Sequence, residues 1–162
     1  MKLNLFLVAI SISALFSPTL RAEIPVYGVI IDTADSAYRE AVEDGLRKGA
    51  TIEKADIYLQ TLESNSADQM VSLCNNMLDR KPNVLLITTA DATTLTSCLD
   101  KAGKLDIPVV AISDSTEAFQ NKHITSVVLA DEADNPHMVG LKAIEQAAQV
   151  IKPNSVTVRK LE

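Results

Sequence analysis

The chain has no tryptophan, only three tyrosines and three phenylalanines, and few basic residues among its 162 positions. Its 15 Lys and Arg stand against 21 Asp and Glu, which gives a formal net charge of −6. Nucleic acids and anionic membranes are bound mainly by clustered Lys and Arg, and because the sequence has no such cluster we expect neither as a partner. His123 and His137 do not have the spacing of zinc ligands, and the common hydrolase and nucleotide-binding motifs are missing. We therefore expect no metal, no cofactor and no enzymatic activity.

The one long apolar stretch lies at the amino terminus. Lys2 precedes Leu3–Phe16, which is almost unbroken apolar sequence, and residues 17–22 have the composition of a cleavage region. The stretch is too short to span a bilayer comfortably, so it predicts a secretory signal peptide over residues 1–22 and a periplasmic location. A buried N-terminal helix is the alternative.

Five short apolar segments alternate with longer segments of helical periodicity. The expected strands are Val26–Ile31, Ile57–Leu62, Val84–Ile87, Val109–Ile112 and Val127–Leu129. The alternation predicts an α/β fold, a three-layer α-β-α sandwich whose parallel sheet has the order 2-1-3-4-5. Right-handed crossovers would place the first helix, from Ser36 to about Lys48 before Gly49, on one face of the sheet. The second helix, opened by Ser66, and the third, capped by Asp91, would lie on the other face.

Polar residues follow the first, third and fourth expected strands. In a sheet of this order the first and third strands flank the point where strand order reverses, and ligands bind beyond the carboxyl ends there. The candidate ligand-binding residues are Asp32, Asp35, Ser36, Tyr38, Arg39, Asp91, Ser113 and Asp114. Two alternatives stay open: Asp35, Ser36 and Asp91 only cap helices, and Arg39 faces solvent and pairs with Glu43.

Three segments resemble the type I periplasmic binding proteins, in particular ribose-binding proteins and the related periplasmic partners of sensor kinases. They are Val29–Asp32 with Tyr38 and Asp44-Gly45, Val84–Thr88 with Asp91, and Asp106–Ile112, within a similarity that covers roughly residues 24 to 151. The resemblance implies a two-lobed receptor that closes on a small ligand. Residues 23–132 would form the amino-terminal lobe, with Asp131 and Glu132 at the hinge. Residues 133–162 would hold a crossover helix, which leaves the sheet, and the first strand of a truncated second lobe.

The same resemblance implies a function and its partners. We expect a solute-binding protein for a sugar, polyol or zwitterion that serves ABC-type uptake or sensing with an inner-membrane permease or sensor protein. The alternative is a noncatalytic adaptor for a membrane sensor kinase or chemoreceptor, and the short chain leaves room for a separate second lobe or self-association. Arg39 stands where the family has its second aromatic residue, which favours an acidic or zwitterionic ligand over a plain sugar.

Two cysteines lie on the apolar faces of the second and third expected helices. If these helices are neighbours, the Cα atoms of Cys74 and Cys98 should lie within about 7 Å of each other, the limit for an unstrained bridge. Export to an oxidising compartment favours a disulfide. Two buried thiols that act as small apolar side chains are the alternative.

Overall fold

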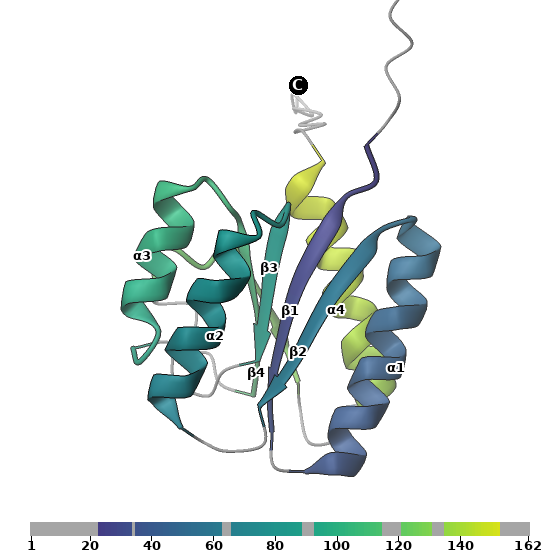
Figure 1. Cartoon of the computed structure of the whole chain (residues 1–162). Coiled ribbons are helices and arrows are strands. Elements are labelled where there is room, and N and C mark those ends of the chain that lie inside the picture. The colour runs from purple at the N-terminus through teal and green to yellow at the C-terminus, as the bar shows by residue number, and fades with distance from the viewer. Residues whose placement is uncertain are drawn as a thin grey trace, which may run out of the picture.

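The computed structural model describes residues 23–33, 35–62, 66–88, 93–114, 121–130 and 135–152. They form a parallel sheet between two layers of helices (Figure 1), with five strands in the order β2-β1-β3-β4-β5. The elements are β1 (Val26–Asp32), α1 (Ser36–Glu53), β2 (Asp56–Leu62), α2 (Ala67–Asp79), β3 (Val84–Thr88), α3 (Thr96–Lys104), β4 (Val109–Ser113), β5 (Ser126–Leu129) and α4 (Pro136–Ile151). The predicted three-layer fold and strand order are confirmed. No helix of the described residues is long and apolar enough to cross a membrane.

The sheet is most deeply buried at its centre. All residues of β3 and β4 are buried, as expected for parallel strands covered by helices on both faces. β2, the predicted edge strand, pairs only with β1 among the described strands, and most of its residues are partly or fully exposed. The polar and apolar mixture in β2 therefore marks its place at the edge.

The helices divide between the faces as predicted for the first three. α1 packs on one face with Val42 and Leu46, whereas α2 and α3 cover the other. The prediction that the last helix leaves the sheet is wrong. α4 packs beside α1, and its Val139 and Ile144 are fully buried in the same core as β1, β3 and β4. The apolar stripe of α4 has to be removed from water, and α4 buries it against the sheet face beside α1.

Glycines let α1 and α4 approach each other closely. A Cβ on Gly45 would collide with the backbone carbonyl of His137, and a Cβ on Gly49 would lie 2.8 Å from Cβ of Ile144. The prediction that α1 ends at Gly49 is wrong for this reason: Gly49 serves helix packing and stays helical. The helix ends instead at Glu53. Lys54 is its C-cap residue: it has a φ of 55°, and its backbone N–H bonds to carbonyls of the last turn.

The other helices begin with different kinds of N-cap. Asn135 caps α4, since its Oδ1 accepts a hydrogen bond from the His137 amide at 3.0 Å. Ser66 is the N-cap residue of α2, but its hydroxyl makes no capping hydrogen bond. α3 begins only at Thr96, with Leu95 at the N-cap position, and Asp91 lies outside the described residues.

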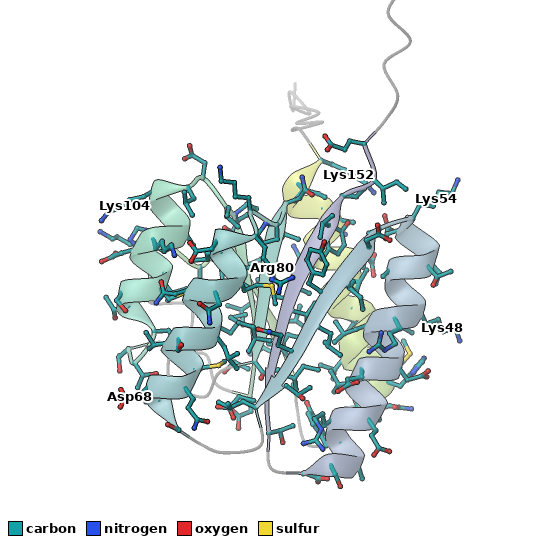
Figure 2. The ribbon with its side chains drawn as sticks, in the orientation of Figure 1. Lys48, Lys54, Asp68, Arg80, Lys104 and Lys152 are labelled. Atoms are coloured by element: carbon teal, nitrogen blue, oxygen red, sulfur yellow. A yellow bond between two sulfur atoms is a disulfide. The ribbon has the colours of Figure 1, made fainter. Side chains whose placement is uncertain are left out.

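Four charged residues lie at helix ends where the helix dipole favours their charge. The helices begin near the carboxyl ends of the strands and end at the opposite edge of the sheet, so their dipoles point the same way. Figure 2 shows Lys54, Lys104 and Lys152 at the ends of α1, α3 and α4, and Asp68 at the start of α2. Cations near a helix C-terminus and anions near an N-terminus are both stabilised by the helix dipole.

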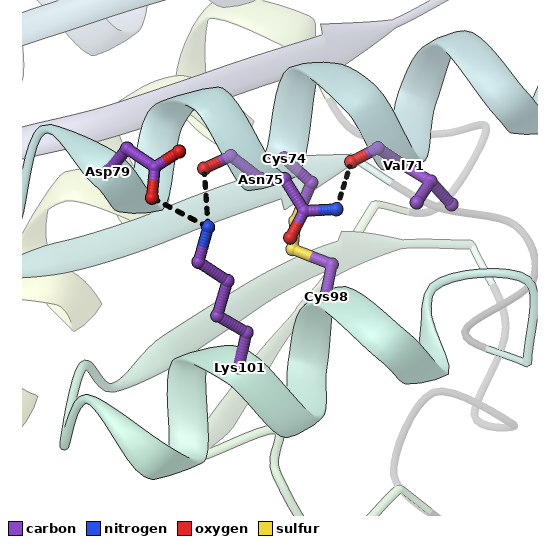
Figure 3. Close-up of a disulfide and its surroundings, with 6 residues drawn as sticks. All are labelled: Val71, Cys74, Asn75, Asp79, Cys98 and Lys101. Atoms are coloured by element: carbon purple, nitrogen blue, oxygen red, sulfur yellow. Dashed lines mark hydrogen bonds and ion pairs between the residues drawn. A yellow bond between two sulfur atoms is a disulfide. The ribbon is translucent and has the colours of Figure 1, made fainter.

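A disulfide joins α2 to α3 (Figure 3). Cys74 and Cys98 are bonded, and their Cα atoms lie 6.1 Å apart, which confirms the predicted pairing. A second link runs beside it: Lys101 Nζ on α3 donates to Asp79 Oδ1 at 2.7 Å and to the Asn75 carbonyl at 3.2 Å, both on α2. One covalent bond and two polar contacts therefore link α2 to α3 on one face of the sheet.

Candidate ligand-binding site

The carboxyl ends of three neighbouring strands bring three polar residues to one edge of the sheet. Asp32 ends β1, Thr88 ends β3 and Ser113 ends β4. β1 and β3 are adjacent, and β3 pairs with β4, so these ends form a continuous rim, the lower edge of the sheet in Figure 1. We call Asp32, Thr88 and Ser113 the strand-end rim. It lies at the point where strand order reverses, as predicted from the sequence.

Thr88 ties the centre of this rim together. Its Oγ1 accepts a hydrogen bond from the Asp32 amide at 2.6 Å and donates one to the Asp32 carbonyl at 3.4 Å. The residue is 8% exposed. Sequence reasoning did not select Thr88, although a hydroxyl that ends an otherwise apolar, fully buried strand is a signal that could have indicated it.

The Asp32 carboxyl group is the most unusual polar group of the rim. Its Oδ1 is buried and has no hydrogen-bond partner among the described residues. Burial raises the pKa of Asp32 above its ordinary value of 3.8, because removal from water penalises the charged form. A buried acceptor without a donor costs stability, so a ligand that supplies a donor here would recover that cost.

Asp35 and Ser36 lie at the start of α1. Asp35 is its N-cap, and its Oδ1 accepts from the amides of Ala37 at 2.9 Å and Tyr38 at 3.1 Å. Asp35 therefore caps the helix, and whether it also contacts a ligand stays a prediction. Ser36 is the first helical residue and is exposed.

Tyr38 and Arg39 lie in the first turns of the same helix. Tyr38 is half-buried and packs against the core shared by α1 and α4. Arg39 Nη1 donates to the carbonyl of Thr33, in the loop after β1, at 3.4 Å. Glu43, the partner expected for Arg39 in the solvent-facing alternative, lies 3.8 Å from Arg47. Arg39 therefore supports the loop that follows β1.

The remaining candidates divide between placed and unplaced residues. Ser113 is 4% exposed, and its carbonyl accepts from the Ala130 amide at 2.9 Å, whereas Asp114 is exposed beside it. The candidates Asp91, Asp131 and Glu132 lie outside the described residues. Across the part of the chain that the structure describes, no group of three or more His, Cys, Asp or Glu residues could hold a metal ion.

A comparison with known protein families finds one that matches most of the chain. The family described as periplasmic binding protein domain matches residues 27–154. A search of curated protein sequences finds no match.

Solved structures share the fold at low sequence identity. GanP, a glucose-galactose binding protein from Geobacillus stearothermophilus, aligns with a TM-score of 0.59 and 13% identity over 80% of this chain and 55% of its own. A periplasmic solute-binding protein from Actinobacillus succinogenes, with bound D-allose, aligns with a TM-score of 0.56 and 17% identity over 79% of this chain and 56% of its own. A 3-dehydroquinate dehydratase-like protein from Bifidobacterium longum also aligns, with a TM-score of 0.59 and 8% identity, over 80% of this chain and 100% of its own.

The structural likenesses by themselves establish only the fold, because the same three-layer architecture occurs in a dehydratase-like protein. The chain spans about half the length of the two sugar-binding proteins, and between 30% and 34% of other ABC-transporter proteins and a LacI-type regulator. The family match extends over most of the sequence. The chain belongs to the periplasmic binding protein domain family.

Proposed function

We propose that the chain is a periplasmic solute-binding protein that takes a small polar ligand, a sugar or a related polyol or zwitterion, at the strand-end rim. The observation that carries the proposal is the buried Asp32 Oδ1, which has no partner among the described residues and lies where strand order reverses. Family membership supports a solute-binding role. The two sugar-binding relatives named above support a sugar or a polyol.

The chemistry of the rim suits hydroxyl and ammonium donors. Asp32 offers a carboxylate acceptor, and Thr88 and Ser113 place buried hydroxyls beside it, of which the Thr88 hydroxyl is hydrogen-bonded to the Asp32 backbone. Asp35 and Asp114 add negative charge beside them, which disfavours a bare anion.

Tyr38 supplies the one aromatic side chain near the start of α1. Sugar rings present C–H groups that pack well on aromatic faces, and sugar sites commonly use two such rings. With Arg39 in place of a second ring, one face of the ligand would be covered by Tyr38 alone. We infer a weaker preference for flat hexose rings than the resemblance to ribose-binding proteins implies.

The lobe boundary in this proposal differs from the expectation drawn from the sequence. Because α4 is packed into the same core as α1, we propose that the amino-terminal lobe extends through Ile151. Asp131 and Glu132 then connect β5 to α4 within one lobe, and the crossing to a second lobe follows α4. The other wall of the ligand cleft would come from that second lobe.

Uptake or sensing completes the proposal. A ligand-loaded lobe would dock on an inner-membrane permease or sensor protein, after export directed by residues 1–22. The disulfide between Cys74 and Cys98 suits an oxidising compartment such as the periplasm.

Thermal-shift screening of the purified chain against sugars, polyols, amino acids and organic acids tests this function. Ligand at 100 times its Kd stabilises a protein by about 2.7 kcal/mol, so even millimolar binders raise the melting temperature measurably. Asp32→Asn should weaken the bound ligand about 10-fold to 100-fold, because hydrogen bonds to charged groups contribute about 1.5–3 kcal/mol. Asp56→Asn, at an exposed carboxylate on the opposite edge of the sheet, is the matched control and should leave the affinity unchanged.

Two outcomes would contradict the proposal. One is that no compound of these classes raises the melting temperature, and the other is that Asp32→Asn and Asp56→Asn bind the ligand equally well. A chain that binds no small molecule but forms a stable complex with a membrane receptor would be the noncatalytic adaptor instead.

A further inference from the structure

The outer edge of β2 carries a groove that the ligand site does not use. It has a volume of about 350 Å³ and is lined by residues of β2, by Arg47 from α1, by Met77 from α2 and by Arg80, the C-cap residue of α2. β2 pairs with β1 on one side, and among the described residues no strand pairs with its other side. Unpaired backbone N–H and C=O groups along such an edge can hydrogen-bond an additional strand.

The two arginines reach this edge from opposite faces of the sheet. α1 lies on the face covered together with α4, and α2 lies on the other face. Arg47 is well exposed, with 60% of its side chain accessible. Arg80 lies between α2 and β2 in Figure 2, and its guanidinium is 5.3 Å from the centre of the Tyr58 ring. A strand added to β2 would therefore pass between two arginines, and its acidic residue would compete with Glu43, which lies 3.8 Å from Arg47.

Side-chain alternation defines which strand would fit. Successive residues of a strand point to opposite faces of the sheet, and an added strand would lie about 4.8 Å from β2. Two acidic residues that are adjacent in sequence would thus meet Arg47 on one face and Arg80 on the other. Acidic residues two apart would both point to the same face and could meet only one arginine.

We propose that the β2 edge is a docking site for an extended acidic peptide segment of a partner protein, one that carries two neighbouring Asp or Glu residues. Tyr58, which is 45% exposed, provides apolar area for the side chains of the added strand on the face of Arg80. Arginine suits this role because its planar guanidinium can donate two parallel hydrogen bonds to one carboxylate.

A second copy of the chain fits the edge less well. Antiparallel pairing of two β2 strands about a twofold axis would bring both arginines of each copy to one interface. Like charges across such an interface repel each other. The charges therefore favour an acidic partner segment over self-association.

Fluorescence anisotropy with two labelled nine-residue peptides tests the proposal. Both peptides alternate Thr and Val, and they have the same composition. In the first peptide Glu and Asp are adjacent at the centre, and in the second they are two positions apart. The adjacent-acid peptide should bind about fivefold more tightly, as expected for one additional exposed ion pair of about 1 kcal/mol. Its binding should weaken between about 0.1 M and about 1 M salt, where the screening length falls from about 10 Å to about 3 Å.

Substitutions locate the site. Arg47→Gln and Arg80→Gln should each weaken the adjacent-acid peptide about fivefold and abolish its advantage over the other peptide. Lys48→Gln removes an exposed cation on α1 that does not line the groove, and it should change nothing. Circular dichroism of each variant confirms that these surface changes leave the fold intact.

Three results would overturn the proposal. The first is equal binding of the two peptides, and the second is binding that neither arginine substitution alters. The third is a dimer in sedimentation velocity that Tyr58→Lys dissociates, which would show that a second copy occupies the edge. These results are independent of the ligand screen, because the β2 edge and the strand-end rim share no residue.

Discussion

Breaking the disulfide between Cys74 and Cys98 should lower the stability of the protein by a calculable amount. The bond joins α2 to α3 through two cysteines that are 24 positions apart in the sequence. Loop-closure entropy for about 25 residues gives about 3.5 kcal/mol of stabilisation, through restriction of the unfolded chain. For a domain of this size the loss corresponds to a fall in melting temperature of about 13 °C.

The assay compares thermal unfolding of the oxidised protein with that of the same protein after reduction, with thiol titration to prove that the bond is open. Reduction keeps both buried sulfur atoms in place, so it reports the cross-link alone. The double variant Cys74→Ala with Cys98→Ala should melt lower still, because both side chains are fully buried and their loss leaves a cavity.

A matched control removes the neighbouring noncovalent link between the same helices. Lys101→Ala loses the ion pair with Asp79, whose side chains are 33% and 66% exposed, and should cost at most about 1 kcal/mol. If the reduced protein melted within about 4 °C of the oxidised protein, most of the expected stabilisation would be missing and the entropic reasoning would be refuted.

Two further predictions concern the core and the strand-end rim. Gly45→Ala should destabilise the protein by about 1–3 kcal/mol, because the new Cβ meets the backbone carbonyl of His137 and forces α1 away from α4; chemical denaturation measures this. Gly103→Ala, whose Cβ would meet the imidazole ring of His123 and no backbone atom of another element, should stay within about 1 kcal/mol of the parent protein, and an equal loss in both variants would contradict the packing argument. The raised pKa of Asp32 means that, as pH rises above the ordinary value of 3.8, the unfolded chain loses this proton before the folded chain does, so the free energy of unfolding falls. Asp32→Asn should lack this fall and therefore melt higher than the parent near pH 7 but not near pH 3; a variant that gains nothing at neutral pH would show that the carboxyl group is well solvated.

Much of the fold could be predicted because local patterns and global packing agree. Apolar strands such as Val84–Ile87, without polar interruption, have to be covered on both faces, and the right-handed crossover rule then fixes which helices share a face. The pairing of Cys74 with Cys98 follows from the same adjacency. These features depend on residue type and spacing, which the sequence displays directly.

The errors arose where tertiary contacts override local signals. Gly49 is a common helix terminator, but here it accommodates Ile144 of a helix far away in the sequence. The family resemblance predicts a crossover helix that leaves the sheet. The apolar stripe of α4, which includes Val139 and Ile144, argues instead that the helix is buried. When the two arguments disagree, burial of apolar surface is the stronger guide.

The candidate site shows a similar limit. Topology located the rim and selected Asp32, because strand ends converge whatever their side chains are. Individual hydrogen bonds could not be predicted: Thr88 binds the backbone of Asp32, and Arg39 binds the backbone of Thr33. Backbone carbonyls and amides leave no trace in a sequence, so the partners of polar side chains stay hidden until the fold is known.

The close contact between α1 and α4 has a consequence for how the chain acquires its structure. Gly45 near one end of the described chain and Gly140 near the other meet at this contact, so almost the whole domain must be synthesised before α1 finds its cover. Contacts between such distant segments slow folding, since the intervening chain has to be ordered first. Until α4 emerges, the part of the sheet beside α1 stays exposed and the domain cannot close its core. For a chain exported as proposed above, this delay keeps the polypeptide unfolded for the time in which it has to be threaded across the membrane.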